Sequence, residues 1–251
     1  SYNLRYGDFK ARISGYYTRI YDQSKVISYY DDVAATFTNF AMSGIDKVHF
    51  GLEAAVSIPI YHTLALNGAV SWGQYTYDSN PYYLQTQDNS GDIVSDGYVY
   101  WKDFRVESTP QTAVNVGLSW RSNNNIYLSA DFNYYNNMYL SMSPIYRTDA
   151  VITGGMAPGD IEHLRRQEKF DSAYTLNASI GKNWYIHRKY TLGFSLDVKN
   201  ILNNQDIKTG GYEQTRLSKN TETTVTTYQA FDSKYFYMFG TTYYLNLYFR
   251  F

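Results

Sequence analysis

Histidine and closely spaced acidic residues are the side chains of this sequence best suited to bind a metal ion or to transfer protons. The histidines are scattered, at His49, His62, His163 and His187. None of them has a second potential ligand at the sequence spacing that zinc sites use on a strand, turn or helix. The spacing indicates structural polar histidines, and it implies neither a metal nor a cofactor.

Two acidic segments need separate consideration. Asp88-Asn89-Ser90-Gly91-Asp92 is similar to part of a calcium-binding loop, but the acidic spacing and the missing distal Glu do not fit, so we expect a turn in a long hairpin. Asp160, Glu162 and His163 could supply the acid and base groups of a hydrolase. Because neither a nucleophile nor a second acidic pair accompanies them, the sequence does not indicate an enzyme.

Aromatic and basic residues of the long polar segments are better candidates for binding a ligand. Flat amphipathic rings stack on sugars or pack against peptides, and guanidinium groups bind anions. We expect ligand contacts from six residues: Trp101, Tyr100, Tyr98, Tyr139, Tyr146 and Arg147. The same segments contain further candidates: Tyr29, Tyr30, Tyr82, Tyr83, Arg165 and Arg166. The alternative is that these side chains pack the loops against one another.

Strands must position these segments. The last residues, Tyr243 to Phe251, alternate strictly between apolar residues and residues that are mostly polar, which is the period of a β-strand. The same alternation predicts strands over 9–18, 47–58, 64–72, 113–120, 126–135, 174–181 and 192–199. Each strand is long enough to cross a bilayer when tilted, which takes about 9–11 residues. A terminal apolar strand is rare in soluble proteins and typical of outer-membrane barrels.

The connections between these strands also alternate in length. Short turns are expected at 59–63, 121–125 and 183–189, and long polar loops at roughly 22–46, 78–111, 136–172 and 203–234. In outer-membrane barrels, short turns are periplasmic and long loops extracellular. The pattern therefore predicts an all-β, antiparallel transmembrane barrel domain over residues 1–251, in the outer membrane and in contact with its lipid bilayer.

Composition agrees with that class. Aromatic residues make up 18% of the chain and charged residues another 18%. Mean hydropathy is −0.46 and no apolar run is long enough for a transmembrane helix. Half of each barrel strand faces water while Tyr and Trp form bands at the membrane interfaces, so the combination is expected there. A net charge of −1 gives no support for nucleic-acid binding.

Eight strands could close a small barrel by themselves, but two features favour part of a larger one. Ser1 to Tyr6 alternates and meets a Gly7-Asp8 turn, so it reads as the end of an earlier strand. Inward positions are mostly small, whereas a narrow barrel must fill its lumen with side chains. We therefore expect the terminal strand to pair outside these residues. The inward charges should pair with the wall or a plug: Lys10, Arg12, Glu53, Asp131, Asp197 and Lys199.

The carboxy-terminal residues resemble a known family. Asp197-Val198-Lys199-Asn200-Ile201-Leu202-Asn203, then Gly210-Gly211-Tyr212-Glu213 and a final aromatic strand, are similar to the end of a TonB-dependent outer-membrane receptor of the Bacteroidota type. Gly44, Gly51 and Glu53 resemble a strand opening of that family, and Pro110 with Gly117 and Leu118 its Pro-led downward strand.

The resemblance implies a barrel of 22 strands, an amino-terminal plug and a TonB box, and we expect neither the plug nor the TonB box within these residues. It also implies energised uptake through the inner-membrane TonB complex and an extracellular lipoprotein partner. Siderophores, cobalamin, glycans and peptides are the ligand classes it suggests. The alternative is a self-contained small barrel with a structural or adhesive role.

Overall fold

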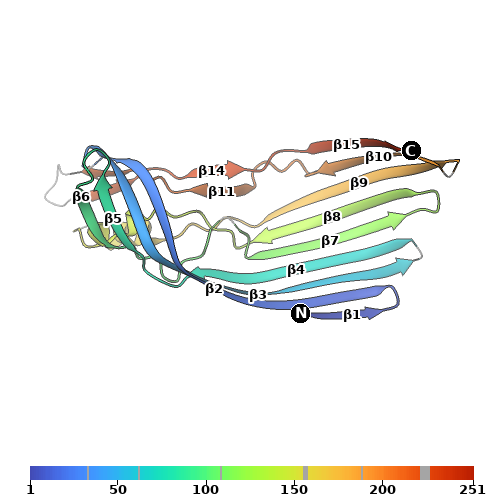
Figure 1. Ribbon diagram of the computed structural model, residues 1–251, viewed down its shortest axis with the longest axis horizontal. Coiled ribbons are helices and arrows are strands. Elements are labelled where there is room, and N and C mark those ends of the chain that lie inside the picture. The colour runs from blue at the N-terminus through green and yellow to red at the C-terminus, as the bar shows by residue number, and fades with distance from the viewer. Residues whose placement is uncertain (33, 62, 108, 155–157, 188, 221–226) are drawn as a thin grey trace.

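The chain folds around one large antiparallel sheet of long strands (Figure 1). The computed structural model describes residues 1–32, 34–61, 63–107, 109–154, 158–187, 189–220 and 227–251. Every neighbouring pair in the order β1-β2-β3-β4-β7-β8-β9-β10-β15 is antiparallel. These strands are β1 (Tyr2–Tyr6), β2 (Phe9–Asp31), β3 (Thr36–Tyr61), β4 (Leu64–Tyr77), β7 (Thr112–Arg121), β8 (Ile126–Asn136), β9 (Ala173–Ile186), β10 (Tyr190–Lys199) and β15 (Thr242–Arg250).

The all-β prediction is confirmed, and each expected strand lies within one of these elements except at Phe251, which follows the end of β15. Short turns join β3 to β4, β7 to β8 and β9 to β10, as the connection lengths predict. The Gly7-Asp8 turn joins β1 to β2, and Gly7 takes a φ of +59°, a conformation that glycine adopts without strain. Within the described residues, β1 pairs in the main sheet with β2 alone and β15 with β10 alone, so the sheet has two open edges.

The register of the sheet collects the apolar positions on one face. Leu66 pairs with Leu118, and Leu118 pairs with Ala130 on the next strand. At the terminal pair, Phe194 lies opposite Leu247. Because side chains alternate along a strand, the small and polar residues share the other face. We call the two sides the apolar face and the polar face, and this part of the sheet the wall.

The prediction of a long loop at 22–46 is wrong. β2 and β3 continue through it as a paired hairpin, in which Val26 lies opposite Ala41 and Tyr30 opposite Phe37. β-branched and aromatic residues favour this extended pairing. The ladder is interrupted between Ile20 and Lys25, where Asp22 takes a φ of +51°. Such bulges bend and twist a strand pair while leaving the ladder on both sides intact.

The other long segments also contain ordered elements. Strands β5 (Tyr82–Gln87) and β6 (Ile93–Tyr98) form a hairpin, and β5 pairs with the outer part of β3. Segment 136–172 contains the 3-10 helix η1 (Ile145–Arg147) and the helices α1 (Asp149–Ile152) and α2 (Pro158–Arg165). Two small sheets follow, formed by β11 (Lys208–Tyr212) with β14 (Lys234–Tyr237) and by β12 (Leu217–Asn220) with β13 (Thr227–Ala230).

These outer segments gather at one end of the wall and contain the hydrophobic core (Figure 1). We call residues 22–46, 78–111, 136–172 and 203–241 the loop cluster. Its buried residues come from all four segments and include Phe40, Tyr83, Trp101, Tyr146 and Leu217. The wall between the turns and the loop cluster is a single layer of strands (Figure 1). The chain therefore packs its loops together and leaves the apolar face of the wall uncovered.

Candidate functional site

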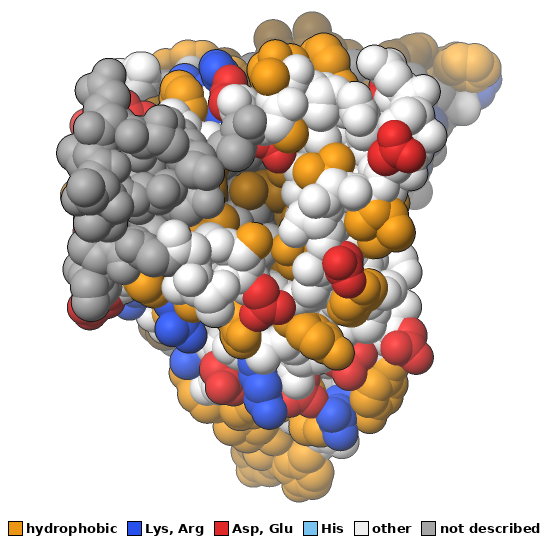
Figure 2. All heavy atoms as spheres, turned by 90° about the vertical axis from the view of Figure 1, so that its left-hand side faces the viewer, with side chains coloured by type: hydrophobic (Ala, Val, Ile, Leu, Met, Phe, Trp, Pro, Cys, Tyr) orange, Lys and Arg blue, Asp and Glu red, His pale blue; other side chains and the backbone are white. Residues whose placement is uncertain are grey.

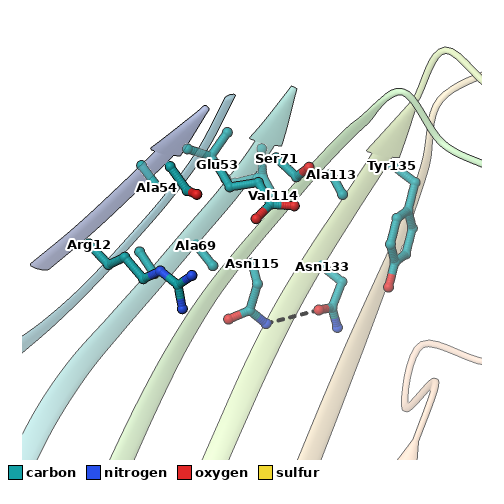
Figure 3. Close-up of a pocket in the computed structure, with 13 residues that line it drawn as sticks. Arg12, Glu53, Ala54, Ala69, Ser71, Ala113, Val114, Asn115, Asn133 and Tyr135 are labelled. Carbon is teal, nitrogen blue, oxygen red and sulfur yellow. Dashed lines mark hydrogen bonds between the residues drawn. The ribbon is translucent and has the colours of Figure 1, made fainter. Parts of the chain in front are cut away.

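The polar face of the wall is lined by short hydroxyl and amide side chains that hydrogen-bond across strands. Asn115 donates to Asn133 at 2.9 Å (Figure 3). Asn133 donates to Thr175 at 3.4 Å. Ser129 and Ser179 are 2.8 Å apart on the same face. A hollow with a volume of about 340 Å³ is lined by Asn115 and Asn133, together with small residues of the neighbouring strands such as Ala55, Ala69 and Ser71. Small polar residues therefore leave open space on this side of the sheet.

Tyrosine rings on the polar face lie against glycines of neighbouring strands. Tyr248 lies opposite Gly193 in the register, and a Cβ atom at Gly193 would collide with the Tyr248 ring. Tyr127 covers Gly181 in the same way. The Tyr248 hydroxyl donates to Asn183 at 2.5 Å, which fixes the ring along the sheet. Glycine is needed at these positions so that the rings lie flat against the backbone.

Basic residues cluster near the turns on the polar face. Arg5 and Lys10 lie directly opposite each other, and Arg12 follows Lys10 on the same face. Within the described residues, these three side chains make no ion pair or hydrogen bond, and neither do Glu53 and Asp131. Like charges directly opposite destabilise a sheet. The expected pairing of inward charges within the wall is therefore not observed.

Three of the six predicted ligand-binding residues are buried in the interior of the loop cluster. Trp101 is 2% exposed and its ring packs on Tyr77, with centroids 4.8 Å apart. Tyr146 is also buried and donates a hydrogen bond to the Arg216 carbonyl. Burial, together with the nearby Glu213 charge, raises the pKa of Tyr146 to about 12. These rings pack the loops against one another, which was the alternative reading.

Arg147 is the third buried residue and is fully enclosed. Its guanidinium binds both carboxylate oxygens of Glu213, at 2.5 and 2.9 Å, and donates to the Ser143 carbonyl at 3.0 Å. Ser143 N–H donates to the same Glu213 carboxylate at 2.8 Å. The bidentate pair joins segment 136–172 to segment 203–241, so Arg147 is engaged within the protein.

The remaining three predicted residues are accessible but do not form one pocket. Tyr98 is 53% exposed, and its ring meets Tyr82 edge-on at 5.6 Å. Tyr100 is half-buried, and its pKa is raised chiefly by a hydrogen bond to Asp149. Tyr139 is half-buried, and its backbone forms a bridge with Lys169. A ligand role for Tyr98, Tyr100 and Tyr139 stays a prediction.

A cavity of about 210 Å³ lies where the four loop segments meet. We call it the loop-junction pocket. Its floor is apolar, and Phe40 and Tyr83 stack there with centroids 4.6 Å apart at 12°. Its lining comes from every loop segment: Tyr29, Asp31, Asp32, Ala34, Phe40, Tyr83, Gln85, Val94, Ser95, Ile145, Thr148, Ala150, Val151, Thr215 and Leu217.

Two carboxylates lie at this pocket. Asp31 accepts a hydrogen bond from Gln85 at 2.6 Å. Asp32 accepts two from Arg216, at 2.8 and 2.9 Å, and this contact lowers the pKa of Asp32. Burial raises the pKa values of Tyr29 and Tyr83. Tyr29 and Tyr83 are among the residues expected from the sequence, whereas Asp31 is not. The pocket brings together residues from Tyr29 to Leu217, and no local sequence pattern connects residues so far apart.

The described residues of the segments considered for metal or acid-base chemistry form no metal site. Asp88 to Asp92 is the turn between β5 and β6, as expected, and Ser90 donates to Asp92 there. His49 packs on Tyr75 at 4.8 Å. His62 lies outside the described residues, as do the side chains of Asp160 and His163. Among the residues that the structure describes, no three acidic, His or Cys side chains are placed to hold a metal ion.

Neither a protein-family model nor a curated protein matches the chain. In the described part of the chain, no helix has both the length and the apolar character needed to cross a bilayer.

Proposed function

We propose that this chain is a carboxy-terminal wall segment of a TonB-dependent outer-membrane transporter, with the apolar face toward lipid and the polar face toward the lumen. The uncovered apolar face carries this proposal. Leu247 is 70% exposed, and Val116 and Leu118 are each 46% exposed. Leaving a side chain of this size in water forgoes about 1.5–3 kcal/mol, so a face of them requires an apolar environment. Lipid is the occupant that fits a continuous curved sheet without a second protein layer.

Aromatic residues at both ends of the apolar face support the same occupant. On β9, Tyr174 and Trp184 share this face and lie ten residues apart. At about 3.4 Å per residue this is about 34 Å along the strand, and a tilt of about 40° reduces it to about 26 Å. The apolar band of an outer-membrane barrel is about 25 Å high. Lys182 lies over the Trp184 ring at 5.3 Å, as expected of a basic residue that reaches toward headgroups.

The polar face supports a wide lumen that another part of the protein fills. Many of its side chains are small, and the cations Arg5, Lys10 and Arg12, which have no partner among the described residues, would gain from an acidic surface opposite them. A plug within the lumen provides such a surface. Transport itself is proposed from the resemblance of the residues around Asn200 to the receptor family.

Site-directed spin labelling tests the orientation of the wall. The sequence contains no cysteine, so each introduced cysteine is labelled alone. Labels at V116C and L118C should be accessible to oxygen dissolved in lipid, whereas labels at N115C and S119C should be accessible to a water-soluble relaxation agent. The four positions alternate on β7, so each label has a matched control one strand position away. Equal accessibility at all four positions would contradict a membrane wall.

Uptake measurements test the transporter assignment. Cells that contain the full-length protein should import radiolabelled peptides, glycans or iron chelates only when the inner-membrane energising complex is intact. Equal uptake without that complex would indicate a passive pore. Absence of uptake and binding for all three classes, together with cross-linking of β15 to β1, would favour the small structural barrel.

A further inference from the structure

The loop cluster and the rest of the chain carry opposite charge. The four loop segments contain 19 Asp and Glu but 11 Lys and Arg, a net charge of −8, and Figure 2 shows acidic side chains distributed over the loop end of the molecule. The remaining residues contain 4 acidic and 11 basic residues. On β8, β9, β10 and β15 the acidic residues are Asp131 and Asp197, which lie on the polar face opposite Gly117 and Ser179. The apolar face of these four strands, all of which the structure describes, therefore carries no carboxylate.

Lys182 is a basic residue on the apolar face, near the turn end of β9. Its register neighbours on the adjacent strands are Ile126 and Phe194, which belong to the same face. The Lys182 ammonium lies over the Trp184 ring at 5.3 Å, on the side of the turn. A charge on the lipid face of a barrel destabilises most at the membrane centre and least near the interface, and a flexible lysine can reach headgroup level while its stem stays among apolar groups. The ammonium is therefore placed to meet headgroups.

A second cation lies beside it, at the turn between β9 and β10. The Lys189 ammonium is 5.2 Å from the Tyr190 ring. Tyr190 pairs with Ile186, two residues beyond Trp184, so Tyr190 and Trp184 are diagonal neighbours with Cα atoms about 7–8 Å apart. Phe249 of β15 stacks on Tyr190, with centroids 5.8 Å apart at 15°. Two lysines and three aromatic rings thus share one patch at the turn end of the wall, opposite the loop cluster (Figure 1).

The two lysines of this patch are not neutralised within the described chain. Neither Lys182 nor Lys189 makes an ion pair or a side-chain hydrogen bond with another described residue. Trp184 is 40% exposed and Phe249 58% exposed, so the rings offer apolar area next to the cations. Basic residues at a membrane surface attract negatively charged lipid, and aromatic rings suit the level of the headgroups. The patch is complementary to a molecule that joins a negative headgroup to an apolar chain.

We propose that this patch binds an anionic phospholipid of the membrane leaflet at the turn end, and we call it the headgroup site. Lys182 and Lys189 would contact the negatively charged headgroup, and Trp184 and Phe249 would lie along an acyl chain. The inference rests on the proposed function, because it names the lipid that part of the lipid-facing surface prefers. Phosphatidylglycerol is the anionic probe and phosphatidylcholine, whose headgroup has no net charge, is its counterpart.

Quenching by brominated lipids tests the proposal in the purified full-length protein. A fluorophore is attached at I186C, opposite Tyr190, or at L64C, the matched position on the apolar face at the turn end of β4. The protein is reconstituted in phosphatidylcholine vesicles that contain either brominated phosphatidylglycerol or brominated phosphatidylcholine. At I186C, phosphatidylglycerol should associate at least about fivefold more strongly than phosphatidylcholine, and less so at high salt. At L64C the two lipids should quench equally, because neither Lys nor Arg shares that face of β4 or β7.

Charge variants separate the headgroup site from general attraction. K182Q and K189Q should each reduce the preference for phosphatidylglycerol at I186C by up to about fivefold, and the double variant should reduce it to the level at L64C. K182R should retain the preference, because the positive charge remains. K199Q is the matched control: Lys199 is exposed and lies on the polar face at the other end of β10, opposite Thr242, so its loss should leave the preference unchanged.

An equal preference at I186C and L64C would overturn the proposal, as would an undiminished preference in K182Q/K189Q. Loss of the preference on addition of inorganic phosphate at constant ionic strength would assign the patch to a soluble anion and would also overturn it. These outcomes are distinct from a failure of the proposed function. Quenching at both positions without a preference would remove the headgroup site alone. Absence of quenching by either lipid at both positions would remove the membrane wall, and the headgroup site with it.

Discussion

Replacement of Arg147 by Met should open the loop cluster while leaving the wall folded. The guanidinium is fully buried and binds Glu213 through two hydrogen bonds, and the Glu213 side chain is only 12% exposed. R147M leaves that carboxylate with the Ser143 N–H as its remaining described donor. Removing one partner of a buried ion pair costs about 3–5 kcal/mol. Such a loss approaches the whole stability expected of a small cluster.

Hydrogen exchange of the full-length protein measures this opening locally. Three backbone amides report it: Tyr100 N–H donates to the Arg147 carbonyl, Leu140 N–H to Glu168, and Glu213 N–H to Ser141. A loss of about 3–5 kcal/mol corresponds to exchange about a hundred- to several-thousand-fold faster. Amides in the β7–β8 ladder should exchange at the original rate, because those strands share no contact with Arg147.

The double variant R147M/E213Q supplies the control. The amide of Gln can still accept from Ser143 N–H, and no unpaired charge is left in the core, so a large part of the lost protection should return. If R147M accelerates exchange by less than about tenfold, the pair is not buried between the loops and the reasoning is refuted. Acceleration in β7 and β8 as well would show that the loop cluster and the wall unfold together.

Further predictions concern the wall and one ion pair. V116R places a charge on the apolar face and should destabilise the protein in lipid by about 2–4 kcal/mol, whereas N115R on the polar face should not, as measured by urea unfolding in vesicles. G193A should lower the free energy of unfolding by about 1–3 kcal/mol, because its Cβ atom meets the Tyr248 ring. Y248S should restore this loss, and an equal loss with and without the Tyr248 ring would rule out the contact. Arg216 binds the Asp32 carboxylate and holds its folded-state pKa below the ordinary value of 3.8. The contribution of this pair to the stability of the folded protein is therefore fully present above that value, and it is lost as pH falls through the folded-state pKa. Exchange at the tip of the β2–β3 hairpin should therefore increase below about pH 4 in the native protein, and R216M should remove that additional increase.

Strict alternation predicted the wall well because the two faces of a strand differ in polarity. Leu118 on the apolar face and Asn115 on the polar face illustrate how period two fixes both the strand and its register. The outer half of the β2–β3 hairpin was missed, although Val26 to Tyr30 are β-branched or aromatic at most positions. Both faces of that half carry mixed side chains, so polarity did not mark it as a strand.

The candidate site was harder to predict, because burial inside the loop cluster depends on contacts between distant segments. Trp101 and Tyr146 have the residue types of ligand-binding rings, and their large apolar area suits them equally to a packed interior, where the Tyr146 hydroxyl also makes a hydrogen bond. Arg147 could be recognised as buried only once Glu213 was known to face it. Sequence spacing contains no information about that pairing.

The contacts of the loop cluster have a consequence for the order in which the protein folds. Several wall pairs are hairpins, such as β7 with β8 and β9 with β10, and each of these closes only a short stretch of chain. The contact between Asp32 and Arg216 spans 184 residues. Long chain closures lose more entropy and form more slowly than local hairpins. The loop cluster should therefore assemble only after the wall has brought its strand ends together, and a folding intermediate would have a completed wall with loops still apart.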